Sequence, residues 1–235
     1  MRVFWAFLGL LLAGDAAAEP SEMPRPLGCY ERLYGLKSEL SEGRWYLRLP
    51  SGERVIWDDG AAKDFETQLA KPDVQDQFAV PYKTGPQRRE PGIDHDPGRV
   101  RVTAILAAIF PVQVDKVEQL MWLGWFGTRL HVHRLIAPAL ERVRGRIEAA
   151  IAKNPSLRPW LDRPGGAYVY RPIAGTDRLS AHSFGIAIDI DPKRCEYWRW
   201  DHNLQGNSQK PFLRPIPAAL VEAFESIKKE PLSRA

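Results

Sequence analysis

One histidine and one aspartate stand on either side of a glycine in the segment SAHSFGIAIDID, residues 180–191. They are His182 and Asp189, with Gly185 between them. Neutral imidazole and carboxylate are the ligand types that a catalytic zinc ion takes when it also keeps a water. The segment therefore offers two candidate metal ligands. The ordinary alternative is a hydrogen-bonded structural histidine and an aspartate that forms a turn.

The apolar alternation after Gly185 predicts a strand that presents Asp189 to a pocket. Successive side chains of a strand point to opposite faces. Asp189 then lies on the face opposite the isoleucines, which can pack into a core: Ile186, Ile188 and Ile190. The small residues Gly185 and Ala187 leave room for a metal ion or a peptide backbone to approach.

Three further polar residues near this pair each have two interpretations. Arg171 can hold a substrate carboxylate or a developing oxyanion, because its planar fork suits both, or it can pair with an acid such as Asp189 or Asp177. Ser180 can hydrogen-bond a metal ligand or serve as a turn hydroxyl. Asp191 shares the face of Asp189 and either orients the site or ends the strand before a proline.

The remaining histidines are weaker candidates. His131 and His133 stand two positions apart in an alternating stretch and could share a metal, but no carboxylate lies nearby in the sequence. We therefore expect them on the surface of a strand. His95 lies in GIDHDPG and is expected in a turn, and His202 lies in the polar segment DHNLQGN, which predicts a surface loop.

The run YRPIAGTDRLSAHSFGIAIDID, residues 170–191, resembles the signature of zinc peptidases that cut bacterial cell-wall peptides. These are the VanY-like D-alanyl-D-alanine carboxypeptidases and the related L-alanyl-D-glutamate endopeptidases. Three other segments are similar to this family in the same order: DPGRVRVT at 96–103, PGG at 164–166 and YWRW at 197–200. The resemblance extends over residues 96–225. Its motif is carried by Ser180, His182, Gly185, Ala187 and Asp189.

The resemblance implies that His182 and Asp189 are the first two zinc ligands. The third ligand of the family is a second histidine nearer the C-terminus, with an acidic general base three positions before it. No histidine follows His202 in this sequence, which ends at Ala235. We therefore expect a shortened chain that lacks the third ligand and the base, both of which peptide hydrolysis needs.

The expected function follows from this resemblance. It is a zinc metallopeptidase that hydrolyses peptidoglycan stem peptides next to D-amino acids, of the carboxypeptidase or the endopeptidase type, and that is inactive if the third ligand and base are missing. The alternative is a non-catalytic module that binds cell-wall peptides. A third hypothesis is an unstable fragment with an exposed sheet edge.

The first eighteen residues predict a secretory signal peptide. They combine a basic start at Arg2, an apolar stretch from Val3 to Ala13 and three small residues before Glu19. The apolar stretch is short for a transmembrane span, although an uncleaved anchor is the alternative. We expect an exported, periplasmic protein without stable membrane insertion.

The net charge indicates which classes of binding partner fit this chain, and the two cysteines raise the question of a disulfide. The net charge is +4 and the pI about 9.1, which suits an anionic wall polymer. No compact Lys/Arg run marks a nucleic-acid partner. An exported location permits a disulfide between Cys29 and Cys195, but their distance in the sequence leaves both the paired and the unpaired state open.

The elements that must position the motif predict an α+β fold, with helices packed on a small, mostly antiparallel sheet. Residues 19–95 are expected to be a leader and an irregular region, and residues 96–235 a peptidase-like domain. The strongest helical periodicity covers 135–153 and stops at Asn154-Pro155. A second helix is predicted from about Pro217. We also expect a helix over 115–123, a strand over 125–132, and a short helix with strands over 30–58.

Overall fold

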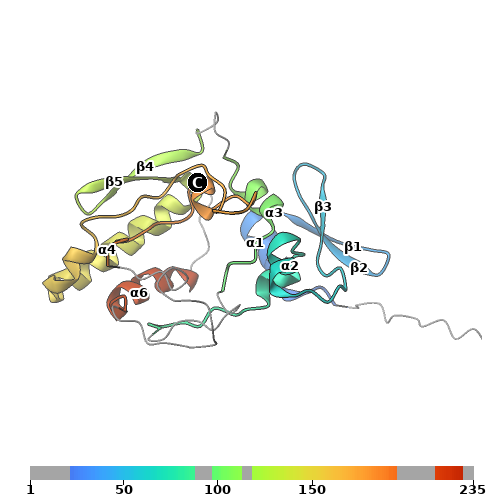
Figure 1. Ribbon diagram of the computed structural model, residues 1–235, viewed down its shortest axis with the longest axis horizontal. Helices are drawn as coiled ribbons and strands as arrows, with labels where there is room; N and C mark the ends of the chain where they lie inside the picture. The colour runs from blue at the N-terminus through green and yellow to red at the C-terminus, as the bar shows by residue number, and fades with distance from the viewer. Residues whose placement is uncertain (1–21, 88–96, 113–117, 195–214, 230–235) are drawn as a thin grey trace, which may run out of the picture.

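The computed structural model describes residues 22–87, 97–112, 118–194 and 215–229. Its helices and strands form two groups that lie on opposite sides of the molecule (Figure 1). The N-terminal group contains α1 (Arg25–Tyr34), β1 (Lys37–Ser41), β2 (Arg44–Arg48), β3 (Arg54–Ile56), α2 (Phe65–Ala70) and α3 (Thr103–Ile109). The C-terminal group contains β4 (Leu120–Trp125), β5 (Thr128–His133), α4 (Ala137–Lys153) and α6 (Ala218–Glu225). The predicted α+β class is confirmed.

The N-terminal group is more regular than its sequence predicts. Strands β1, β2 and β3 form an antiparallel sheet in that order. Pro24 stands at the N-cap position of α1 without a side-chain capping bond, and a second proline lies in the first turn, where the missing N–H costs nothing. The Asp64 side chain accepts a hydrogen bond from Thr67 N–H at 2.8 Å and so caps α2. The short helix and strands expected over 30–58 are therefore present, whereas α1 begins within the expected leader and α2 lies within the stretch expected to be irregular.

Strands β4 and β5 form an antiparallel hairpin. Its two-residue turn has positive φ at both positions, 40° at Phe126 and 92° at Gly127, which is the turn geometry that matches strand twist. The helix expected over 115–123 is wrong for residues 120–123. Inward-facing residues of this hairpin alternate with outward-facing ones, and the inward set is Leu123, Trp125, Leu130 and Val132.

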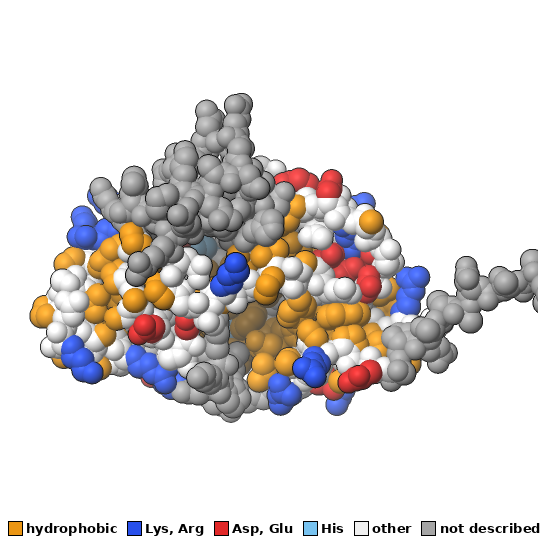
Figure 2. Space-filling view, turned by 90° about the horizontal axis from the view of Figure 1, so that it is seen from below, with side chains coloured by type: hydrophobic (Ala, Val, Ile, Leu, Met, Phe, Trp, Pro, Cys, Tyr) orange, Lys and Arg blue, Asp and Glu red, His pale blue; other side chains and the backbone are white. Residues whose placement is uncertain are grey.

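Helix α4 covers the inner face of the hairpin and confirms the helix predicted over 135–153. A 3₁₀ turn, Arg134–Ile136, precedes it, and Asn154 ends it. Helix α6 also confirms its prediction, and it packs beside α4. Seen from below, the molecule is hollowed near its middle, and hydrophobic side chains line the hollow (Figure 2).

One hydrophobic core lies between the hairpin, α4 and α6. The two groups of elements meet in a second hydrophobic core. Buried side chains from the N-terminal helices and sheet pack there with Phe184 of the histidine-containing segment. This core contains residues on both sides of position 96, where the sequence suggested a domain boundary. The division of the chain into domains stays a prediction. The remaining buried members are Leu27, Leu36, Leu47, Leu49, Val74, Val102, Ile105, Ile109 and Phe110.

Several predictions fall on residues outside the described ranges. These include the signal peptide, the YWRW segment, His95, Cys195 and His202. Cys29 is exposed on α1. Within the described part of the chain, no helix combines the length and apolar character needed to cross a membrane.

Candidate metal centre

His182 stands on a short 3₁₀ helix, Ala181–Phe184. The Ser180 hydroxyl caps this helix by accepting the His182 N–H at 3.3 Å. Gly185 ends it with a φ of 65°. A Cβ at Gly185 would lie 2.9 Å from the backbone nitrogen of His133 and 2.7 Å from Leu120 Cδ2. Only glycine therefore fits where this segment crosses the end of the hairpin.

The residues after Gly185 run in an extended conformation but form no ladder strand. Their one bridge pairs Asp189 with Gly166, through an Asp189 N–H to Gly166 carbonyl bond of 3.1 Å. The Gly165 N–H donates to the Asp189 carbonyl at 2.8 Å. The prediction of a regular β-strand is wrong, because the neighbouring segment forms only those two backbone hydrogen bonds with it.

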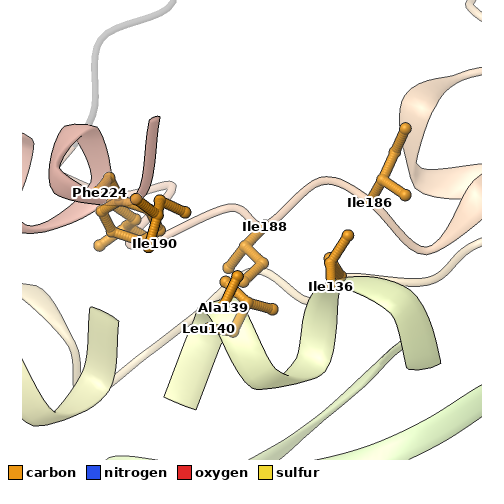
Figure 3. A pocket seen from close by; sticks show the side chains of 8 residues that line it. Ile136, Ala139, Leu140, Ile186, Ile188, Ile190 and Phe224 are labelled. Carbon is orange, nitrogen blue, oxygen red and sulfur yellow. The ribbon is translucent and has the colours of Figure 1, made fainter. Parts of the chain in front are cut away.

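The predicted faces of this segment are nevertheless present. Its three isoleucines line a cavity of about 380 Å³, where Ile188 points toward α4 and Ile190 toward Phe224 of α6 (Figure 3). Asp189 alternates with them and its side chain is 52 % exposed. The cavity is apolar throughout and is lined by Ile136, Ala139, Leu140, Ile186, Ile188, Ile190, Phe224 and Ile227.

The imidazole of His182 faces the carboxylate of Asp189. The Nε2 atom lies 3.5 Å from Asp189 Oδ1. On the other side of the ring, Nδ1 lies 2.5 Å from the carbonyl oxygen of Ala167. Because a carbonyl can only accept, Nδ1 carries a hydrogen and donates it. In the neutral ring Nε2 then presents a lone pair to a carboxylate oxygen, and the pair needs a proton or a cation between the two atoms.

His182 and Asp189 shift each other's pKa values. The hydrogen bond with Asp189 raises the pKa of His182, and it does so against burial, with the Ala167 carbonyl adding to the rise. The same hydrogen bond lowers the pKa of Asp189, again against partial burial. Without another cation, a proton on the imidazole supplies the positive charge of this site.

The donor atoms fit a zinc ion. Ligands at about 2.0–2.1 Å from a tetrahedral zinc lie about 3.3–3.4 Å apart, close to the 3.5 Å between His182 Nε2 and Asp189 Oδ1. The Ala167 carbonyl fixes the tautomer and the ring orientation, as a partner of a metal-binding histidine does. Among the described residues, no third His, Cys, Asp or Glu joins this pair.

The other predicted site residues lie around the pair. Arg171 is exposed, and its charge lowers the pKa of both His182 and Asp189. Its backbone is fixed by Ser183, whose hydroxyl accepts the Arg171 N–H at 2.9 Å. Ser180 is buried and its hydroxyl has the turn role described above.

Asp191 lies away from this site. It is fully buried, accepts the Lys193 N–H at 2.9 Å and lies 3.2 Å from Arg194 Nε. These contacts fold the chain into a turn after the extended segment.

The two hairpin histidines do not form a metal site with each other. His133 is buried, contrary to the expected surface position, and stands edge-on to Phe110 with ring centroids 5.2 Å apart. Its Nδ1 accepts the Leu135 N–H at 3.2 Å. Burial lowers the pKa of His133 to about 4. His131 instead stacks on Trp122, with centroids 4.6 Å apart.

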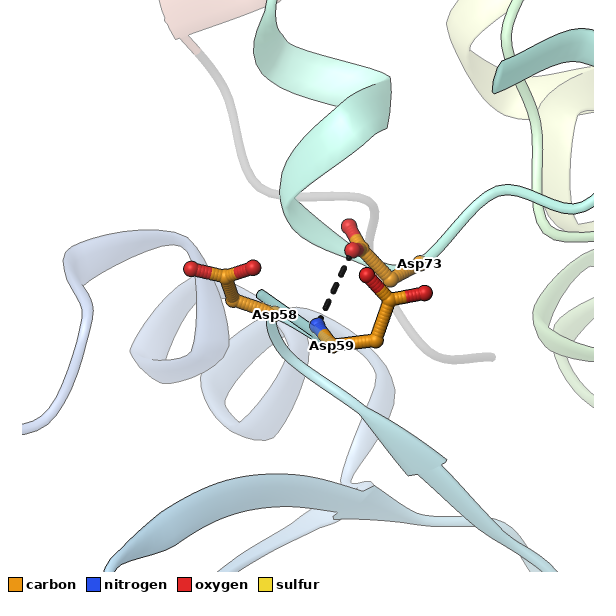
Figure 4. A group of neighbouring side chains, drawn as sticks. All are labelled: Asp58, Asp59 and Asp73. Carbon is orange, nitrogen blue, oxygen red and sulfur yellow. Dashed lines mark hydrogen bonds between the residues drawn. The ribbon is translucent and has the colours of Figure 1, made fainter. Parts of the chain in front are cut away.

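A cluster of acids in the N-terminal group has the spacing of a metal site (Figure 4). It consists of Asp58, Asp59 and Asp73. The Lys63 ammonium lies 2.8 Å from Asp59 and 2.9 Å from Asp73, and is itself 5 % exposed. An ammonium group thus already lies against two of the three carboxylates.

Sequence reasoning missed the Ala167 carbonyl, because a backbone atom leaves no residue-type signal. The nearby Pro164-Gly165-Gly166 is indicated only by the family resemblance. The structure explains Gly165, since a Cβ there would lie 2.8 Å from Asp189 Cβ and 2.5 Å from Pro192 Cγ. The glycine allows this segment to approach the aspartate closely.

Comparison with known proteins supports the resemblance over part of the chain. No curated protein and no solved structure matches it. Residues 174–229 match a family model described as D-alanyl-D-alanine carboxypeptidase. The match includes His182 and Asp189 and is narrower than the range of 96–225 suggested by sequence motifs. The segment that carries the candidate metal ligands is thus similar to the D-alanyl-D-alanine carboxypeptidase family, VanY-like peptidases.

Proposed function

We propose that the protein is a zinc metallopeptidase that hydrolyses peptidoglycan stem peptides next to D-amino acids. The observation that carries this proposal is the pair of metal-ligating atoms, His182 Nε2 and Asp189 Oδ1, held 3.5 Å apart with the outer ring nitrogen fixed by a carbonyl. The family match over residues 174–229 supports the reaction class. Export to the periplasm, as the first eighteen residues predict, would bring the protein to this substrate.

Each residue at the site has a separate task. A bound zinc ion would polarise the scissile carbonyl and lower the pKa of a water. His182 and Asp189 would hold the ion, and the Ala167 carbonyl would keep Nε2 directed at it. The exposed Arg171 carries a positive charge that acts on both ligands. Its planar fork suits a carboxylate of the stem peptide.

A non-catalytic peptide-binding module is the second candidate. The observation that favours it is the absence of a third donor beside the pair among the described residues. Two protein ligands hold zinc less tightly than the three that catalytic sites usually provide. A module of this kind would keep the contacts of Arg171 with a peptide carboxylate but would leave the peptide bond intact.

Zinc content and cleavage of muropeptides, measured on the full chain, test this proposal. We expect one zinc ion per chain, and mass spectrometry of the products shows whether a terminal D-alanine leaves or the peptide is cut nearer the sugar. His182→Ala should abolish both zinc binding and cleavage. The matched control is Asp58→Asn in the acidic cluster of the N-terminal group, which should change neither.

The outcomes separate the two candidates. Zinc binding and cleavage that both depend on His182 support the peptidase. Peptide binding without cleavage, in a protein saturated with zinc, rejects the peptidase in favour of the module. A chain that binds neither zinc nor stem peptide overturns both. Saturating zinc at about a hundred times its Kd should also stabilise the wild type by about 2.7 kcal/mol.

A further inference from the structure

The extended segment after Gly185 is the last member of a hydrogen-bonded layer in the described part of the chain. Both backbone groups of Asp189 bind residues 165–166, at 2.8 and 3.1 Å. The stretch that contains these two residues continues to Tyr168, whose N–H donates to the His131 carbonyl of β5 at 3.0 Å. The order across the layer is therefore β4, β5, residues 165–168 and residues 186–190.

The backbone groups of Ile188 and Ile190 face the outer edge of this layer. Successive residues of an extended chain direct their N–H and C=O groups to alternate sides. Since both groups of Asp189 face residues 165–166, those of its two neighbours face away. Among the described residues, neither Ile188 nor Ile190 donates or accepts a backbone hydrogen bond. Their donors and acceptors are thus left for water or for another molecule.

An apolar cavity lies beside this open edge. The side chains of Ile188 and Ile190 line it on one side, and Ala139, Leu140 and Phe224 line it on the other (Figure 3). Its volume is about 380 Å³ and all its lining residues are apolar. The two isoleucines are only partly buried, so the core does not enclose them completely. Such a cavity offers no hydrogen bonds and takes hydrocarbon groups.

We propose that the edge formed by Ile188 and Ile190 binds an extended peptide as an additional antiparallel strand, with an aliphatic side chain of that peptide in the cavity. An unpaired edge presents N–H and C=O groups at strand spacing, and another backbone matches this pattern. In an antiparallel pair, residues opposite each other direct their side chains to the same face. The peptide residues that pair with the isoleucines therefore also direct their side chains to the cavity.

The two features together favour a peptide over the other possible occupants. A free hydrocarbon chain would fill the cavity but would leave the backbone groups of Ile188 and Ile190 unpaired. A second copy of this chain is disfavoured by charge. The register in which both isoleucines find a partner places the two Asp189 carboxylates directly opposite each other, where like charges destabilise a sheet.

The test separates backbone pairing from side-chain contact. The probe is a capped nonapeptide in which leucine alternates with threonine between terminal lysines, titrated calorimetrically into the full chain with a metal chelator. N-methylation of the leucines removes the N–H groups that would face the edge. N-methylation of the threonines removes those that would face away. We expect the first change to weaken binding by about tenfold or more and the second to leave it within about twofold.

Filling the cavity tests the side-chain contact. Ala139→Leu places additional methyl groups in the cavity and should weaken binding of the unmodified peptide by about tenfold. Ala149→Leu is the matched control, because Ala149 lies on the exposed side of the same helix, and it should leave the affinity unchanged. Circular dichroism and melting temperature verify that both variants are folded.

Loss of affinity confined to the leucine-methylated peptide supports the inference. Equal affinities of the two methylated peptides overturn it, and so does the absence of binding of the unmodified peptide at about 1 mM. A dimer of the free chain in analytical ultracentrifugation, if Ala139→Leu dissociates it, assigns the edge to a second copy and also overturns the inference. None of these measurements uses zinc or cleavage, so the result is independent of the peptidase proposal.

Discussion

The acidic cluster around Lys63 and the His182–Asp189 pair differ in the source of their positive charge. In the N-terminal group, three aspartates surround Lys63, whose ammonium lies within 2.8–2.9 Å of an oxygen of each: Asp59, Asp73 and Asp76. In the C-terminal group, Asp189 faces His182 at 3.5 Å with no lysine or arginine ion-paired to it in the described residues.

The difference separates a structural cluster from a candidate metal site. Burial opposes the charge of Lys63, but its hydrogen bonds with the three aspartates outweigh burial and raise its pKa. The cluster holds one internal ammonium, whose single positive charge offsets only part of the charge of the three carboxylates. The His182–Asp189 pair is more exposed and has donor atoms at the spacing of zinc ligands. Close acidic oxygens alone therefore do not identify a metal site, and the nearest cation must be considered too.

The largest expected effect comes from removing the cation of the closed cluster. Lys63→Met keeps the length of the side chain but leaves the buried Asp73, 5 % exposed, without its partner. We expect a loss of about 3 kcal/mol in the free energy of unfolding, measured in urea. The control Lys37→Met removes an exposed lysine and should cost less than about 0.5 kcal/mol. Equal losses would show that Lys63 does not stabilise the cluster.

An intermediate effect is expected at the glycine that positions His182. Gly185→Ala combines a left-handed φ of 65° with contacts of 2.9 Å to the backbone of His133. We expect a loss of about 2–3 kcal/mol and weaker zinc binding, measured by urea unfolding and by metal titration. Gly43→Ala has a similar φ of 71° with open space around it, so it isolates the backbone strain, about 1 kcal/mol. If Gly43→Ala costs as much, the close contact at Gly185 is unimportant.

The smallest effect concerns the open pair without metal. The folded state raises the pKa of His182 above 6.5 and lowers that of Asp189 below 3.8. His182 therefore contributes to the free energy of unfolding at acidic pH, and this contribution is lost as the pH rises through its raised pKa. The contribution of Asp189 is lost as the pH falls through its lowered pKa.

Urea unfolding in the presence of a metal chelator tests this pH dependence. We expect Asp189→Asn to cost less than about 1 kcal/mol at pH 5.5, because the carboxylate is half exposed, and almost nothing at pH 9. The difference is measured as the shift in urea midpoint at the two pH values. A cost that grows toward pH 9 would contradict the assigned charges of the metal-free pair.

Local patterns in the sequence were sufficient for the long helix α4, for α6 and for the two faces around Asp189. The hairpin is less predictable, because the apolar residues of 115–123 also fit a helical period and only Gly127 of the two turn residues is a residue type that favours positive φ. The ring fixation by Ala167 was out of reach, since it depends on a backbone atom fifteen residues away. The burial of His133 depends on Phe110, whose place in the core is a long-range contact.

The segment that carries both candidate ligands is anchored in both halves of the molecule. Phe184 inserts into the core shared with α1 and the three-stranded sheet, whereas Ile188 and Ile190 pack against the core of the other half. If the two halves moved apart, this segment would be stretched, and the distance between the His182 imidazole and the Asp189 carboxylate would increase. The zinc affinity proposed for this pair should therefore depend on how closely the two halves pack. Deleting residues 22–87 would leave His182 and Asp189 in the chain but would remove much of the core in which Phe184, close to His182, is buried.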